Sequence, residues 1–311
     1  PRPALTHGPI SCFVGSVYKR DMDSTSSERT FSIQRGAMVT SLQRCAPSTE
    51  YITIDSDALI VLSEKFDAGE AASVVSTFLP AFVALHHGNF VSPAQRYSHA
   101  AFSGQRILIT GGHQWVANVA ARLACMHGAA QVYVLRHGYS HDAAGKRRKN
   151  TAPQQIVYMN SDPDVWLDRL RGVVDVILDY DYPTNLDAVT QVLSARDDCR
   201  LVCIKPTTLE RARKTHAARP GWWNRIHDYS ALLALPNASL LDYKQLRKTN
   251  TRELEADLKY LFHLLSKRMI RPKIDSYLRP RDVVPCLNDA MCRRLERRRI
   301  EGELIVEPWR R

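Results

Sequence analysis

The segment Gly104-Gln-Arg-Ile-Leu-Ile-Thr-Gly-Gly112 contains a short apolar strand that ends in two glycines. A helical pattern follows, with apolar residues on one face: Val116, Val119, Ala120, Leu123 and Ala124. Gly128 ends this helix, and Gln131-Val-Tyr-Val-Leu135 has the pattern of a second strand. A strand, a helix and a strand in this order form a βαβ unit, which requires a parallel sheet with a right-handed crossover. The sequence therefore predicts an α/β fold.

Two further apolar runs have the length of buried strands, Val173–Leu178 and Leu201–Ile204. Helical patterns occur around residues 164–170 and 186–193. We expect these elements to extend the βαβ unit into a Rossmann-like parallel sheet within residues 86–245.

Residues 1–85 are predicted to form a small β-rich domain. Short runs of β-branched and aromatic residues alternate with turn-forming clusters, as in strands joined by tight turns. These runs are residues 11–18, 37–42 and Tyr51–Ile54, with an exposed loop predicted at Asp21–Arg29 and a helical pattern from Asp67.

The last segment, 246–311, is predicted to contain two helices and a strand. Glu253–Ile270 has the spacing of a long amphipathic helix, and Asn250 with Glu253 resembles a capping pair. A second helix is predicted from Asp282, and a terminal strand at Glu303–Val306.

Four passages, taken in order, resemble the quinone-reductase branch of the medium-chain dehydrogenases/reductases. That branch includes zeta-crystallin-like quinone reductases and the enoyl reductases of polyketide synthases. The passages are 51–85, Gly104–Gly112, Val173–Asp179 and the tail from Asp257 to Pro308. The resemblance implies a Rossmann-like domain beside a GroES-like β domain, which the C-terminal segment 246–311 rejoins. It also implies that the β domain is reduced, because residues that form much of the family's substrate cleft are not found before Pro1.

The phosphate-binding turn departs from the pattern of the family. There the turn has a Gly-Gly-Val-Gly-like core, whose glycines let the backbone approach the pyrophosphate of the cofactor. The corresponding residues here are Gln114, Trp115, Val116 and Ala117. Side chains at these points fill the space that the phosphate would take. We therefore predict a packed structural turn, with Trp115 in the cofactor groove and no bound cofactor.

An occupied cofactor site is the alternative. Gly111, Gly112, His113 and Gln114 still offer backbone N–H groups, and His113 adds charge. The second strand ends at Arg136, where an acidic residue would select NAD. An arginine there can instead hold the 2′-phosphate of NADPH, so NADPH is the cofactor expected if the protein is active.

The net charge of +11 is unevenly distributed. Residues 1–150 carry +5, residues 151–211 carry −4, and residues 212–311 carry +10. Two basic groups are predicted to bind a polyanion, RNA or an acidic protein surface. They are Lys146, Arg147, Arg148 and Lys149, and Arg293, Arg294, Arg297 and Arg298. A solvated basic surface is the alternative.

Other chemistry finds little support in the sequence. The seven cysteines are scattered without a C-x-x-C pair, so neither a disulfide framework nor a cysteine-rich zinc site is predicted. Cys203 lies in an apolar run and is predicted to be a buried thiol. Asp179 and Asp181 follow a predicted strand, where loop residues and ligand-binding residues both occur. No residue is predicted to be catalytic, and no membrane span is predicted.

These observations leave three hypotheses for the function. The first is a non-catalytic, basic member of the family that acts as a structural subunit of a larger assembly, such as a mitochondrial ribonucleoprotein or ribosome. The second is an NADPH-dependent quinone or enoyl reductase, and the third is an inactive enoyl-reductase domain of a multidomain synthase. A mitochondrial location is expected from the charge and the start at Pro1, with a cytoplasmic location as the alternative. A homo-oligomer is also conceivable from the family.

Overall fold

The computed structural model describes residues 13–18, 33–43, 51–62, 66–87, 94–111, 115–136, 155–180, 186–196, 198–204, 235, 237–278 and 303–306. The chain divides into two compact units. One contains Pro80–Leu246, and the other combines Ile10–Leu79 with Arg247–Arg311.

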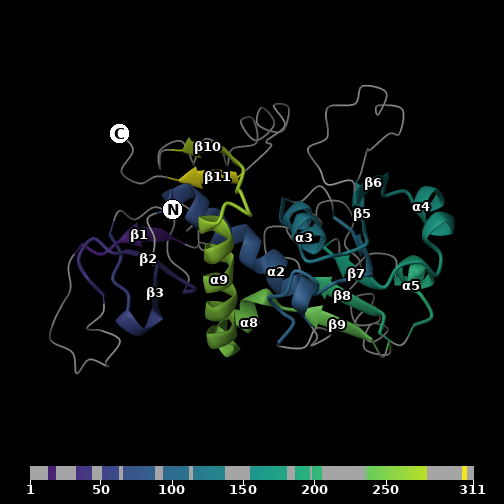
Figure 1. The fold of residues 1–311 in the computed structure, drawn as a ribbon, viewed down its shortest axis with the longest axis horizontal. Coiled ribbons are helices and arrows are strands. Elements are labelled where there is room, and N and C mark those ends of the chain that lie inside the picture. The colour runs from purple at the N-terminus through teal and green to yellow at the C-terminus, as the bar shows by residue number, and fades with distance from the viewer. Residues whose placement is uncertain are drawn as a thin grey trace, which may run out of the picture. The chain divides into compact units, whose positions relative to one another are not determined.

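The first unit is built on a six-stranded sheet in which all neighbouring strands are parallel (Figure 1). Its strands are β4 (Arg106–Ile109), β5 (Gln131–Arg136), β6 (Ile156–Asn160), β7 (Val176–Asp179), β8 (Arg200–Ile204) and β9 (Ala238–Leu241). The order across the sheet is β6-β5-β4-β7-β8-β9. This is the doubly wound order of a Rossmann fold, in which the chain reverses its direction of travel between β4 and β7.

Helices join and flank these strands: α2 (Leu79–His86), α3 (Trp115–Met126), α4 (Pro163–Leu170), α5 (Leu186–Val192) and α8 (Tyr243–Thr249). In α3, the buried residues Ala117, Ala120 and Ala124 recur at helical spacing, so small side chains let the helix lie close to the sheet. Asp162 caps α4 by accepting a hydrogen bond from the Asp164 N–H at 3.2 Å.

Gly128 ends α3 in a conformation that glycine adopts at little cost, with φ at +90°. A Cβ at this position would lie 2.8 Å from the carbonyl oxygen of His99. The sequence predicted this glycine as the helix stop, and the close approach of the 94–104 segment gives a second reason for it.

A buried carboxylate, that of Asp175, joins β4 and β7 at the amino-terminal edge of the sheet. Asp175 accepts hydrogen bonds from the Arg106 backbone N–H at 2.8 Å and from the Ser194 hydroxyl at 3.2 Å. The guanidinium of Arg196 lies 3.7 Å away. Because these partners come from distant parts of the chain, Asp175 fixes where β4 and β7 begin relative to one another.

The second unit contains a three-stranded antiparallel sheet of β1 (Val14–Ser16), β2 (Met38–Ser41) and β3 (Leu59–Val61), with the short helix η2 (Ser56–Ala58) before β3. It also contains α1 (Ala68–Ser73), η3 (Val74–Phe78), α9 (Thr251–Ser266) and the parallel pair β10 (Ile274–Leu278) and β11 (Glu303–Val306). The α/β fold with a Rossmann-like sheet and a reduced β-rich domain, as predicted, is confirmed.

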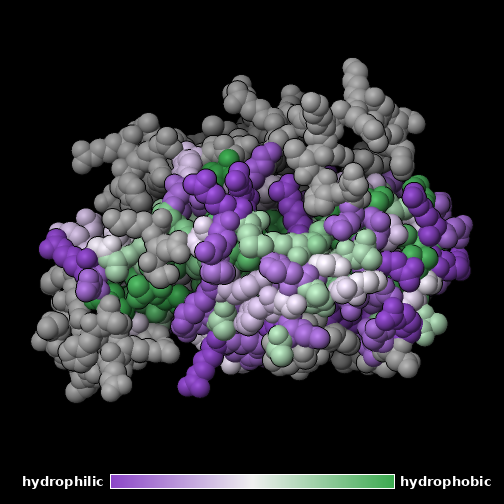
Figure 2. All heavy atoms as spheres, in the orientation of Figure 1, coloured by the Kyte–Doolittle hydropathy of each residue, from purple (hydrophilic) through white to green (hydrophobic). Residues whose placement is uncertain are grey.

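The helix α9 buries one face and exposes the other. Leu254, Leu258 and Leu261 are each no more than 1% exposed. Hydrophilic side chains cover the outward face of the helix in Figure 2. The helix was predicted to reach Ile270, but it ends at Ser266, because Arg268 adopts a left-handed conformation with φ of 57°.

Several other predictions need correction. Tyr51–Ile54 forms no strand, and β3 follows it at Leu59–Val61, where Ile60 is buried against β2. The strands β6 and β9 were not recognised from the sequence. Asn250 does not cap the backbone of α9, and its amide donates instead to the Glu253 carboxylate at 3.3 Å. The loop Asp21–Arg29 and the helix from Asp282 lie outside the described residues.

The run from Ala68 to His86 is a continuous helical stretch of 19 residues, long and apolar enough to cross a membrane. In its most apolar window, 72% of the residues are buried inside the protein. Its hydropathy is therefore accounted for by packing in the protein interior.

Candidate functional site

The carboxyl ends of β4 and β7 lie side by side at the point where the strand order reverses. Open α/β sheets bind their ligands at this point, because the connections leaving the two strands diverge to opposite faces and leave a crevice. The candidate site is therefore sought among the residues that follow β4, β5, β6 and β7.

A buried hydrogen bond joins the two central strands at this edge. The Thr110 hydroxyl donates to an Asp179 carboxylate oxygen at 2.5 Å, and the Thr110 backbone N–H donates to the Leu178 carbonyl at 3.0 Å. Asp179 is 1% exposed. The aspartate thus positions the turn after β4. Asp181, the other carboxylate considered from the sequence, lies outside the described residues.

Neither Cys203 nor Tyr180, which lie beside Asp179, is an activated nucleophile. Cys203 pairs in register with Asp179 and is 0% exposed, as expected from its apolar strand. Burial, and then the nearby Asp179 carboxylate, raise the pKa of its thiol far above the ordinary value. Burial likewise raises the pKa of the Tyr180 hydroxyl. Both groups therefore stay protonated at neutral pH.

The turn after β4 keeps one glycine conformation of a phosphate-binding loop. Gly111 has φ of 67° and is buried. The other predicted loop residues, Gly112, His113 and Gln114, lie outside the described residues. Gly111 therefore turns the chain sharply away from β4, as a loop leading to a helix N-terminus requires.

Trp115 is the first residue of α3 and is partly buried. Its indole nitrogen Nε1 is buried and has no hydrogen-bond partner among the described residues. A buried N–H without a partner costs free energy of about 1–3 kcal/mol. This donor therefore gains from any acceptor that comes within reach of the helix N-terminus.

Arg136 and Tyr158 form a second polar cluster at the same edge. Arg136 is the last residue of β5, and its guanidinium carbon lies 4.9 Å from the centre of the Tyr158 ring on β6. The Tyr158 hydroxyl lies 3.4 Å from the Asn118 amide oxygen on α3. The sequence predicted Arg136 but neither Tyr158 nor Asn118, because β6 was not recognised as the neighbouring strand.

Both predicted polyanion-binding groups lie in parts of the chain that the structure does not describe. Residues 146–149, with Lys146, Arg147, Arg148 and Lys149, lie outside the described part of the chain. So do Arg293, Arg294, Arg297 and Arg298.

A buried cluster of histidine and aromatic rings lies away from this edge, around the end of α2. The His86 Nδ1 lies 2.8 Å from the Phe82 carbonyl oxygen, and its ring centre lies 5.7 Å from that of His127. Burial lowers the pKa of His86 to about 3 and that of His127 to about 4. Within the described residues, no group of three or more His, Cys, Asp or Glu side chains is arranged to hold a metal ion.

No protein-family model matches the sequence, and no curated protein matches it. Solved structures do match the fold. A quinone oxidoreductase from Pseudomonas syringae pv. tomato is 16% identical, with a TM-score of 0.62 over 99% of this chain and 84% of that one. The mycobacterial protein Rv1454c in complex with NADPH is 17% identical, with a TM-score of 0.61 over 96% of this chain and 82% of that one.

The JamJ enoyl reductase is 16% identical, with a TM-score of 0.58 over 95% of this chain and 77% of that one. At such identities the likeness establishes the fold alone. The fold implied by the sequence resemblance, that of quinone and enoyl reductases of the medium-chain group, is thereby confirmed.

Proposed function

We propose that this chain, which has the fold of the medium-chain dehydrogenases/reductases, belongs to their quinone and enoyl reductase branch and reduces a quinone or enoyl substrate with NADPH. The observation that carries the proposal is the cluster of Arg136 and Tyr158 at the carboxyl edge of the sheet, 4.9 Å apart. A guanidinium held over an aromatic ring at the end of the second Rossmann strand suits a 2′-phosphate, where a carboxylate would repel it. NADPH is therefore favoured over NADH.

The residues present fit the adenosine end of NADPH better than its pyrophosphate. Arg136 and Tyr158 would hold the 2′-phosphate and the adenosine, and the turn at Gly111 leads to the N-terminus of α3, where anions bind. The Trp115 Nε1, which has no hydrogen-bond partner among the described residues, is a donor at that helix terminus. The indole N–H would partly replace backbone donors that glycines expose in other members of the group.

When bound, NADPH supplies a hydride, and the protein binds, orients and shields the reactants. The Thr110–Asp179 hydrogen bond would hold the turn below the cofactor in place. Cys203 and Tyr180 stay protonated and would not compete as nucleophiles for an electrophilic substrate.

The second candidate function is a non-catalytic, basic structural subunit of a larger assembly, such as a mitochondrial ribonucleoprotein. Trp115 favours it, because a bulky side chain stands at the start of the helix to which the pyrophosphate would bind. In this case Lys146–Lys149 and the arginines from Arg293 to Arg298 would bind RNA or an acidic protein surface. An inactive enoyl-reductase domain of a synthase would lack this RNA binding.

The test is a titration of the full chain with NADPH and, separately, with NADH. Binding is measured by the change in protein fluorescence and by the shift in melting temperature. The proposal expects saturable NADPH binding that is tighter than NADH binding. Arg136→Glu should weaken NADPH binding by at least about 10-fold, because it replaces the partner of the phosphate with a repelling charge. Arg169→Glu is the matched control, since Arg169 lies on the solvent side of α4.

If NADPH binds, quinones and enoyl thioesters are screened as substrates by the loss of NADPH absorbance. If neither nucleotide shifts the melting temperature at millimolar concentration, the reductase proposal is refuted. RNA binding that weakens steeply with salt would then support the structural subunit, and its absence would favour the inactive synthase domain.

A further inference from the structure

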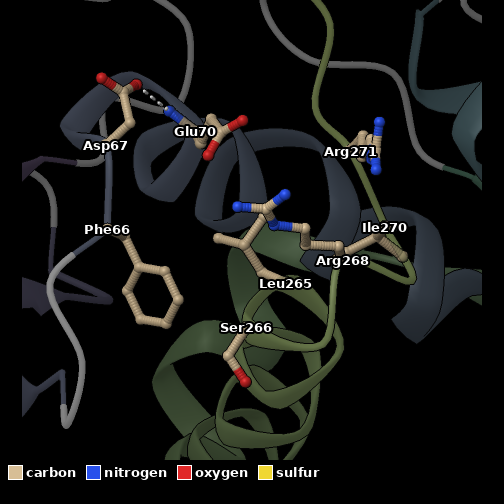
Figure 3. Close-up of a pocket in the computed structure, with 8 residues that line it drawn as sticks. All are labelled: Phe66, Asp67, Glu70, Leu265, Ser266, Arg268, Ile270 and Arg271. Carbon is tan, nitrogen blue, oxygen red and sulfur yellow. Dashed lines mark hydrogen bonds between the residues drawn. The ribbon is translucent and has the colours of Figure 1, made fainter.

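A pocket of about 410 Å³ lies within the second unit, between the start of α1 and the turn that follows α9 (Figure 3). This volume is enough for a small metabolite. Its lining comprises Phe66, Asp67, Glu70, Leu265, Ser266, Arg268, Ile270 and Arg271. The pocket is lined by residues of the second unit, whereas the residues of the Rossmann edge described above belong to the first unit.

The floor of the pocket is apolar and firmly packed. Leu265 is 6% and Ile270 5% exposed. The Phe66 ring stacks on Phe262 of α9, with ring centres 5.3 Å apart. These apolar residues are already packed against the protein without a ligand. The charged side chains at the rim therefore determine which ligand binds.

Three charged side chains at the rim have no ion-pair partner among the described residues. They are Arg268, Arg271 and Glu70. Figure 3 shows the Arg268 guanidinium extending toward the end of the pocket where Glu70 lies. Asp67 is different, because its Oδ1 already accepts hydrogen bonds from the Glu70 N–H at 3.0 Å and from the Tyr277 hydroxyl at 2.9 Å. Two positive groups and one negative group therefore remain to meet a ligand.

Arg268 occupies a backbone position that favours glycine. It is the residue after the helix cap, with φ of 57°, and its N–H donates to the Leu265 carbonyl at 2.9 Å. Helices commonly end with glycine in this conformation, because a Cβ there is strained. An arginine at a strained position, with its guanidinium at a pocket, is an observation that points to a role for the side chain.

We propose that this pocket binds a small amino dicarboxylate, of the chemical class of the acidic amino acids. Arg268 and Arg271 would each receive a carboxylate, and Glu70 would receive the ammonium group. Phe66, Leu265 and Ile270 would contact the carbon chain between them. This pattern of charges is the complement of the two guanidiniums and one carboxylate that line the rim.

The test uses the full chain and isothermal titration calorimetry at low salt, with L-glutamate and L-aspartate as probes. We expect saturable binding of at least one probe, with a Kd of about 1 mM or lower. Glutarate and succinate lack the amino group and should bind more weakly than glutamate and aspartate respectively. In Glu70→Gln this preference for the amino compound should disappear.

The variant Arg268→Gly separates binding from stability. It removes the guanidinium and also relieves the backbone strain, so the protein should melt at a higher temperature while glutamate affinity falls by about 10-fold or more. Lys267→Ala is the matched control, because it removes one exposed positive charge from the neighbouring position without changing the pocket lining.

Three outcomes would overturn the proposal. The first is no binding of L-glutamate or L-aspartate at a probe concentration of about 10 mM. The second is equal affinity for glutarate and glutamate, and the third is unchanged glutamate affinity in Arg268→Gly. A loss of affinity in Lys267→Ala equal to that in Arg268→Gly would show a general charge effect and would also refute the site. Failure of the NADPH titration leaves this test unaffected, because the two ligands are measured separately.

Discussion

Acid should destabilise the first unit through His86 and His127. His86 is 2% exposed and His127 is 0% exposed. Burial is the main cause of their low pKa values, and Arg96, Arg200 and His99 also repel a proton on one ring or the other. Backbone hydrogen bonds with Phe82 and Ser98 offset this only in part. Both histidines are therefore neutral in the folded protein at pH values where they are protonated in the unfolded chain.

The direction of the effect follows from the depressed pKa values. In the folded protein the pKa of His86 is about 3 and that of His127 about 4, against an ordinary value of 6.5. Their contribution to stability is complete above pH 6.5 and is lost progressively as the pH falls toward the folded values. Between pH 7 and pH 5 the free energy of unfolding should fall by about 2 kcal/mol for each histidine, at about 1.4 kcal/mol per pH unit below 6.5.

The measurement is urea unfolding at pH 7 and pH 5 for the wild type, His86→Leu and His127→Leu. Each variant loses stability at pH 7, but the further loss between pH 7 and pH 5 should be smaller than in the wild type by about 2 kcal/mol. His263→Gln is the control, because it removes one exposed histidine from α9 and leaves His86 and His127 in place. Equal pH dependence in the wild type and both leucine variants would refute the reasoning.

Three further predictions concern single positions. Gly128→Ala should lower the free energy of unfolding by about 2 kcal/mol or more, because the added Cβ meets the His99 carbonyl oxygen at 2.8 Å and the residue has positive φ. Gly172→Ala is the control: it has positive φ but nothing within 4 Å of the added Cβ, so it should lower the free energy by only about 1 kcal/mol. Equal midpoints of thermal unfolding for the two variants would contradict this. Asp175→Ala should lower the free energy of unfolding, measured in urea, by about 3 kcal/mol, because Arg106 and Arg196 lose their buried acceptor. A loss below about 1 kcal/mol would show that the carboxylate is dispensable. Trp115→Phe, which removes the indole N–H and keeps an aromatic ring, should weaken NADPH binding by about 10-fold, and unchanged affinity would show that Nε1 is not a ligand donor.

The Rossmann sheet was predictable because its signals are local. The apolar strands β4, β5, β7 and β8 and the small-residue face of α3 are visible in consecutive residues. The strands β6 and β9 were missed for a physical reason. Both lie at an outer position of the described sheet and have partly exposed side chains, and β9 has only two large apolar residues, Leu240 and Leu241.

The candidate site was predicted in part. Arg136 was predicted as a cofactor-binding residue because it ends an apolar strand, which marks the carboxyl edge of the sheet. Tyr158 was not found, because its role depends on β6 pairing with β5, where it lies opposite Val134 in the register. The Thr110–Asp179 bond spans 69 residues of sequence, and no local pattern indicates such a pairing.

The sequence by itself determined the α/β class, the central strands β4, β5, β7 and β8 and the loss of glycines at the phosphate-binding turn. Only the tertiary structure decided which side chains meet: Thr110 with Asp179, Arg136 with Tyr158, and the charged rim formed by Glu70 with Arg268. The physical reason is that secondary structure follows from the periodicity of neighbouring residues. Sites depend on which distant strands and helices pack together, and many packings are compatible with one local pattern.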